Sequence, residues 1–183
     1  RRLVGRRLQE RGRRRLGELV MRLLRHRFAR SARSVYPEDS LRRIADAVHA
    51  AEQRHTGEIC FAVEASLPPL AVLRGVDARA RALQVFAQLR VWDTQANNGV
   101  LVHLLLADRR IEIVPDRGLA GLVSAEQWRG VCQLMEERLR AGDPEDAALA
   151  GIGAISDLLA EHFPQQPGVA DENELPDMPH LLD

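Results

Sequence analysis

Three short polar segments of this sequence carry the residue types that could bind a ligand or do chemistry. The candidate ligand-binding residues are Thr56, Glu58, Asn97, Asn98, Gly99 and Gly118. Asp93, Asp116 and Glu58 could supply the carboxylate oxygens that a divalent cation such as calcium prefers. Arg117 could hold a phosphate group with its forked guanidinium. The segments therefore predict a cation or phosphate site, with Asp93, Asp116 and Arg117 as candidate catalytic residues.

A structural interpretation of the same residues competes with this one. Asn98-Gly99 and Gly118 are typical of tight turns, and Asp116 and Arg117 could pair with each other or with helix ends. The sequence has no G-x-S-x-G, D-x-D, C-x-x-C or G-x-G-x-x-G pattern, and its six histidines show no H-x-x-x-H spacing. His103, within the most apolar segment, is expected to be a hydrogen-bonded core residue rather than a base.

Hydrophobic patterns predict the strands that must position these residues. Residues 58–64 alternate larger and smaller apolar side chains, as in a strand. Residues 100–106 are almost wholly apolar, which is typical of a strand buried on both faces. Residues 107–110 reverse the chain, and residues 111–114 return as a partner strand. Helices are expected at about 37–54, 77–91, 125–142 and 143–163, so the order of elements predicts a mixed α/β sandwich.

The strand order brings the three polar segments together. In an antiparallel hairpin, the start of the first strand and the end of the second lie at the same end of the sheet. Residues 97–99 should therefore lie beside residues 116–118. If the strand after Glu58 runs parallel to the strand after Gly99, with the usual right-handed crossover, residues 56–58 join them.

Composition limits the chemistry and the compartment. The chain has 26 basic residues and every one is arginine, which excludes a lysine Schiff base or the lysine of a phosphate-binding P-loop. Aromatic residues make up only 4%, so the core must be aliphatic. Cys60 and Cys132 lie in apolar segments and are expected to be reduced and buried, which favours a cytoplasmic location.

Charge is divided sharply along the chain. Residues 1–33 hold 13 arginines against Glu10 and Glu18, a net charge of +11, and the remaining residues carry −11. An apolar stripe accompanies the arginines, at Leu16, Leu19, Val20, Leu23, Leu24 and Phe28. The pattern predicts an amphipathic helix that lies on an anionic membrane surface, or docks on a protein partner or on its own domain. Nucleic acid is a weaker candidate because no aromatic residues are interleaved with the arginines.

Three regions follow from these patterns. Residues 1–36 form an arginine-rich helical arm and linker, residues 37–163 form the α/β domain, and residues 164–183 form an acidic tail expected to be disordered. No apolar run is long enough to span a bilayer. The sequence does not begin with Met, so removal of a leader before Arg1 stays open.

The order and spacing of the motifs resemble the TPM domain family, named partly for a thylakoid-lumen phosphatase-like protein of photosystem repair. The matching segments are residues 56–59, 98–101, 108–110, 111–116 and 118–119, with the helix pair around Trp128 and residues 141–143. The resemblance covers roughly residues 38–163, and residues 173–177 look like the tail of a short bacterial branch. It implies a Rossmann-like α/β/α sandwich with a small mixed sheet.

The resemblance also bears on function. Some members of this family have acid-phosphatase-like activity, some bind calcium, and many have no settled function. In relatives, an aspartate often follows the glycine-leucine pair at the end of the matching segments (residues 118–119 here). This chain has Gly121-Leu122-Val123-Ser124 instead, which counts against calcium binding. Signal peptides and membrane anchors of relatives are not seen here. The sequence thus favours a non-enzymatic binding or accessory module with a basic arm, and the alternative is a weak metal-assisted phosphomonoester hydrolase.

Overall fold

A computed structural model describes residues 2–166 and 173–182, with side chains described from Arg15 onward. The helices are α1 (Arg2–Arg27), α2 (Ala32–Val35), α3 (Glu38–Glu52), α4 (Pro69–Leu73), α5 (Ala78–Gln88), α6 (Ala125–Ala141) and α7 (Pro144–His162), with a 3-10 turn η1 (Arg117–Leu119). The strands are β1 (Ile59–Glu64), β2 (Val100–Leu105), β3 (Arg110–Pro115) and β4 (His180–Leu182). The fold is a mixed α/β sandwich, as the sequence predicts.

The four strands form one sheet in the order β3-β2-β1-β4. β1 and β2 are parallel, with Ile59 opposite Val100, and β2 and β3 are antiparallel, with Val100 opposite Pro115. Every residue of β1 and β2 is buried, because helices cover both faces of the sheet. The parallel pair and the hairpin agree with the arrangement expected from the sequence.

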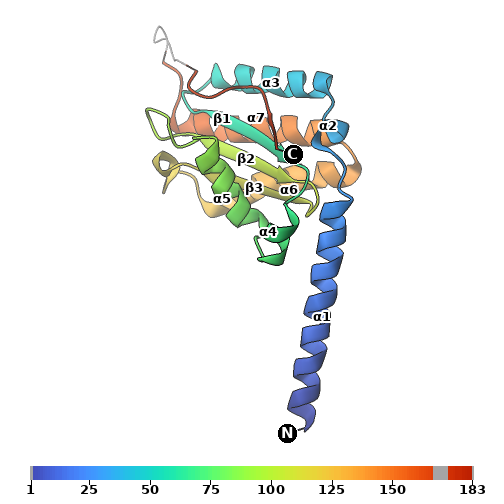
Figure 1. Ribbon diagram of the computed structural model, residues 1–183. Coiled ribbons are helices and arrows are strands. Elements are labelled where there is room, and N and C mark those ends of the chain that lie inside the picture. Colours follow the sequence, from blue (N-terminus) through green and yellow to red (C-terminus); the bar gives the residue numbers. More distant parts are fainter. Residues whose placement is uncertain (1, 167–172, 183) are drawn as a thin grey trace.

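Two helical layers enclose the sheet (Figure 1). Ile59, Phe61 and Val63 of β1 join the larger apolar cluster with residues of α3, α6 and α7. The smaller Cys60 and Ala62 face α5 on the other side. The large and small apolar residues of β1 therefore match a thick helical layer and a thin one.

Helix α6 begins and ends where the sequence indicates. Ser124 and Gln127 form a capping box, in which each side chain accepts a hydrogen bond from the other residue's backbone N–H. Gly142 closes the helix with a φ of 91°, a left-handed conformation that glycine adopts without strain. The two ends fix α6 against the sheet.

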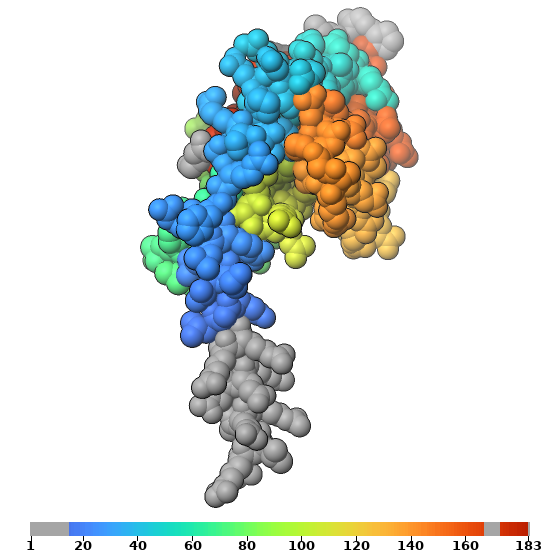
Figure 2. Space-filling view, turned by 90° about the vertical axis from the view of Figure 1, so that its right-hand side faces the viewer, coloured from blue at the N-terminus to red at the C-terminus, as the bar shows by residue number. Residues whose placement is uncertain are grey.

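Helix α1 extends away from the sandwich (Figure 1). Its residues Leu19 and Leu23 pack against a small apolar cluster that contains Leu67, Val72 and Leu105. Figure 2 shows the described part of α1 at the narrow end of the molecule, clear of the α7 layer. The arm is therefore attached to the domain by part of one face.

The C-terminal segment differs from the expectation of disorder. Its residues 180–182 form β4, which runs parallel to β1 with Ala62 opposite His180. Leu175 is buried in the cluster under α5. The prediction of disorder is wrong for residues 173–182, because the few apolar residues that anchor this segment are not evident from its mostly polar composition. Residues 167–172 lie outside the described part of the chain.

Candidate functional site

The three polar segments meet where β1 and β2 begin, which we call the amino end of the sheet. The Asp116 N–H donates to the Gly99 carbonyl at 2.9 Å, and the Gly118 N–H donates to the Asn97 carbonyl at 2.8 Å. The Asn98 amide Nδ2 donates to the Thr56 carbonyl at 2.8 Å. The juxtaposition expected from the strand order is therefore present, and backbone groups make most of its contacts.

Two glycines are required here by close packing. A Cβ on Gly99 would lie 2.1 Å from the Val91 carbonyl oxygen, and one on Gly118 would lie 2.5 Å from the Asn97 carbonyl oxygen. Both distances are far inside van der Waals contact with rigid backbone. These glycines therefore serve the fold of the loops, in agreement with the structural interpretation of the sequence.

Asp116 and Arg117 both have local partners. The Asp116 Oδ1 accepts the Arg117 N–H at 2.7 Å and so caps η1, while the Arg117 Nη2 donates to the Asn97 Oδ1. The Asp116 Oδ2 and the Asn98 Oδ1 are buried and have no hydrogen-bond partner among the described residues. These two oxygens are the part of the predicted site that local structure does not explain.

The C-terminal segment donates hydrogen bonds to the Glu58 carboxylate. The Glu58 Oε1 accepts the Glu174 N–H and its Oε2 accepts the Leu175 N–H, each at 3.2 Å. The Glu174 carboxylate in turn accepts the Gln95 N–H at 2.9 and 3.1 Å. Residues 174 and 175 therefore bridge the start of β1 and the loop before β2. Sequence reasoning missed this role, although the short motif at residues 173–177 was a signal for it.

The candidate metal ligands do not form a ready ligand set. Both Glu58 oxygens face N–H groups of the C-terminal segment, and Asp93 is exposed. Among the described side chains, from Arg15 to residue 166 and in residues 173–182, no group of three or more His, Cys, Asp or Glu is arranged to hold a metal ion. The donors present thus do not fit a calcium ion without rearrangement.

Two titratable side chains beside this end of the sheet have strongly shifted pKa values. His55 is buried and its Nδ1 lies 2.9 Å from the Gly57 carbonyl, and burial lowers its pKa to about 4. Glu52 accepts the Ile59 N–H at 3.0 Å. Burial, followed by the nearby Glu58 carboxylate, raises the pKa of Glu52 to about 8.

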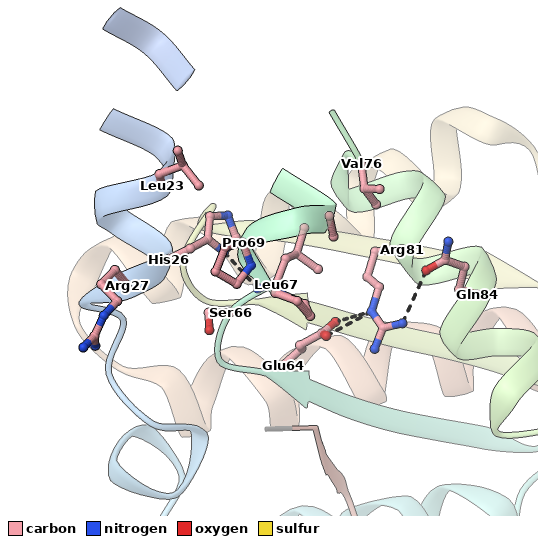
Figure 3. A pocket seen from close by; sticks show the side chains of 12 residues that line it. Leu23, His26, Arg27, Glu64, Ser66, Leu67, Pro69, Val76, Arg81 and Gln84 are labelled. Carbon is pink, nitrogen blue, oxygen red and sulfur yellow. Dashed lines mark hydrogen bonds and ion pairs between the residues drawn. The ribbon is translucent and has the colours of Figure 1, made fainter. Parts of the chain in front are cut away.

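The opposite end of the sheet, where β1 and β2 finish, is built differently. A cavity of about 650 Å³ lies there between α1, α4 and α5 (Figure 3). Parallel α/β sheets commonly bind ligands beyond the carboxyl ends of their strands. The turn-forming residues lie at the other end of the sheet, which is why the candidate site was predicted there.

A buried ion-pair cluster forms the floor of this cavity. The Arg81 Nε donates to both oxygens of Glu64, at 2.9 and 2.8 Å, and the His103 Nε2 lies 3.0 Å from the Glu64 Oε2. Burial opposes ionisation of Glu64, but hydrogen bonds from His103 and Arg81 prevail and keep its pKa below the usual value. His103 is a hydrogen-bonded core residue, as predicted.

Asp108 clamps α1 to this end of the domain. Arg22 of α1 donates to the Asp108 carboxylate, with 2.7 Å from Nη2 to Oδ2, and also to the Val76 carbonyl. The His26 Nε2 lies 3.2 Å from the Asp108 Oδ1, and its Nδ1 accepts the Leu67 N–H at 2.9 Å. Burial, against the pull of Asp108, lowers the pKa of His26. Neutral His26 therefore suits the clamp.

The face of α1 turned away from the clamp is apolar and exposed. Leu16, Val20 and Leu24 of α1, and Phe28 directly after it, follow one another at intervals of four residues, and Phe28 is 75% exposed. We call these four residues the α1 stripe. Leu19 and Leu23, which the sequence placed on the same stripe, instead pack against the domain. The structure thus divides the predicted stripe into a docked part and a free part.

A mixed sheet enclosed by two helical layers defines a Rossmann-like α/β sandwich. Within that class, the family model of the TPM domain matches residues 35–158, more than half of the chain. The protein therefore belongs to the TPM domain family, as its motifs indicate.

A solved structure supports the same assignment. The chain is similar to the BA42 protein from the psychrophilic bacterium Bizionia argentinensis, solved by NMR, with 27% identity and a TM-score of 0.68. The alignment covers 78% of this chain and 92% of that protein. No curated protein matches the sequence. None of the helices in the described residues is both long and apolar enough to cross a bilayer.

Proposed function

We propose that this TPM domain protein is a non-enzymatic binding module that attaches to an anionic membrane surface through α1. One observation carries the proposal: α1 is clamped to the domain on one face while the α1 stripe stays exposed on another. An unclamped helix is able to bury its apolar residues by packing onto its own domain. The clamp at Asp108 prevents that and presents the stripe outward.

Charge supports a membrane as the occupant. The arm carries a net charge of +11 over residues 1–33, and Arg15, Arg25 and Arg30 are exposed. Each arginine near an anionic leaflet contributes about 1 kcal/mol. Apolar insertion and basic attraction together supply the two signals that stable surface attachment needs. A protein partner with an acidic, apolar groove is the alternative occupant.

Vesicle sedimentation tests this proposal with the full chain. Wild-type protein should sediment with vesicles of 30% phosphatidylserine in phosphatidylcholine, about tenfold less with pure phosphatidylcholine, and less again at high salt. Changing Val20 and Leu24 to Gln keeps helix propensity but removes apolar surface, so binding should fall. The matched control changes Leu83 and Leu122 to Gln, since these residues are similarly exposed but lie elsewhere.

Equal sedimentation of the two double variants would contradict the proposal. No sedimentation of wild type with either lipid mixture would favour a protein partner instead.

Metal-assisted phosphomonoester hydrolysis is a second candidate function, favoured by the buried, unpaired Oδ2 of Asp116 beside Arg117. A cation held there would need Asp116 as its main ligand. If hydrolysis occurs, a chromogenic phosphate ester with Ca²⁺, Mg²⁺ or Mn²⁺ should be turned over, and Asp116→Asn should abolish turnover. Asp93→Asn is the control for a merely nearby carboxylate. No turnover together with no metal binding would exclude this function.

A further inference from the structure

The short helix α4 exposes more apolar surface than its fold requires. Val72 is fully buried and Ala71 packs against the cluster that holds α1. Leu70 and Leu73, however, are each 55% exposed. Residues three apart in a helix lie on the same face, so the two leucines form one outward-facing pair. Nothing within the domain covers them in the described residues.

Helix α4, which carries this leucine pair, faces α1 across the cavity described above. The cavity at the carboxyl end of the sheet has one wall from α1, with Leu23 and Arg27, and another from Pro68, Pro69 and Ala71. Figure 3 shows Leu23 and Arg27 on the α1 side of this cavity, and Pro69 and Leu67 facing them. The helix that carries the exposed leucines therefore forms the wall opposite the helix that carries the α1 stripe.

The charge around α4 suits the same surface as α1. Residues 65–76 contain no acidic side chain, and Arg74 directly follows Leu73 and is exposed. The two nearest carboxylates in sequence are both engaged: Glu64 is buried and paired with Arg81, and the Asp77 carboxylate accepts the Ala80 N–H at the start of α5. Leucines that are flanked by arginine, on a helix with no carboxylate of its own, can enter the headgroup region of an anionic leaflet.

We infer that α4 is a second membrane-contacting element, and that Leu70 and Leu73 enter an anionic lipid surface beside α1. This inference rests on the proposed membrane role of α1. It adds that attachment is two-pronged, so the domain is held at the membrane in a single orientation, with the carboxyl end of the sheet facing the lipid. A single helix could instead leave the domain free to swing around the arm.

The test changes Leu70 and Leu73 to Gln in the full chain and measures partitioning onto vesicles of 30% phosphatidylserine. Transfer of two half-exposed leucines predicts that the partition coefficient falls roughly tenfold or more. The Leu83 and Leu122 double variant is again the control, because its exposed area is comparable. Circular dichroism checks that each variant is folded. A second measurement uses Leu73→Trp and follows its quenching by brominated lipid relative to that of wild type, which reports only Trp92 and Trp128; additional quenching requires contact of position 73 with the acyl region.

The outcomes separate this inference from the proposal on which it rests. If the Val20 and Leu24 variant loses binding but the Leu70 and Leu73 variant matches the control, and Leu73→Trp shows no quenching beyond that of wild type, α1 binds membranes and α4 does not. If wild type does not bind vesicles, both ideas fail. If wild type instead forms a dimer in sedimentation velocity that the Leu70 and Leu73 variant does not form, the α4 face binds a second copy and the membrane assignment is overturned.

Discussion

Replacing Leu175 by Ala tests whether the C-terminal segment is part of the folded domain. Leu175 is 7% exposed and packs in the cluster with Cys60 and Leu101, while its backbone N–H donates to Glu58. The substitution keeps that hydrogen bond and removes only the buried side chain. Core Leu→Ala changes cost about 2–5 kcal/mol. Because Leu175 lies at the margin of its cluster, we expect a loss of about 2–3 kcal/mol in the free energy of unfolding.

Equilibrium unfolding in guanidinium, followed by circular dichroism, measures this loss. The denaturation midpoint should fall with little change in the m-value, and the melting temperature should drop by roughly 4–12 °C. Met178→Ala is the matched control, because Met178 lies in the same segment but is 49% exposed. Its effect should stay within about 0.5 kcal/mol. If the two variants were equally stable, the segment would not be packed on the domain and the reasoning would be refuted.

Three further predictions concern the amino end of the sheet. Gly118→Ala should destabilise the domain by more than about 1 kcal/mol in guanidinium unfolding, because its Cβ would meet backbone atoms. Gly130→Ala is the control: it lies in open space on α6 and should stabilise the domain slightly. Equal effects of the two substitutions would refute the steric argument. The pKa of His55 is lowered in the folded state, so its contribution to stability is complete above about pH 6.5. That contribution should be lost, by up to about 3 kcal/mol, as the pH falls toward 4. If the difference in unfolding free energy between wild type and His55→Gln did not change with pH, this prediction would be contradicted. The pKa of Glu52 is raised in the folded state, so its contribution to stability is lost as the pH rises from about 4.5 to 8. Glu52→Gln should therefore become more stable relative to wild type across that window. Equilibrium unfolding of both proteins at a series of pH values would detect or exclude this gain.

Much of the sheet could be predicted because its signals are local. The alternation in β1, the wholly apolar β2 and the polar reversal before β3 each specify a strand within a few residues. Hairpin geometry then dictates which loops meet. The meeting of Asn98 with Thr56 follows from that order alone. The function of these polar residues does not follow from the strand order. It depends on whether their hydrogen-bonding groups are already used within the fold or remain available to a ligand.

Other features depend on contacts that a sequence pattern does not contain. Leu19 and Leu24 look equivalent on a helical stripe, yet one packs on the domain and the other is exposed. The difference arises because Asp108, distant in the chain, sets the rotation of α1 through Arg22. In α5, likewise, Leu83 is 49% exposed, whereas Ala82 and Val85 are buried in the cluster against the sheet.

The pairing of β4 with β1 has a consequence for synthesis of the protein. Leu175 and Glu58 are 117 residues apart in the chain, so the ribosome makes β1 long before its partner. Until then β1 presents an unpaired strand edge and the Glu58 carboxylate lacks these donors. Open strand edges invite pairing with other chains, and contacts of long sequence separation form slowly. We therefore expect nascent chains that stop before residue 173 to be the aggregation-prone species, protected only once the last strand joins the sheet.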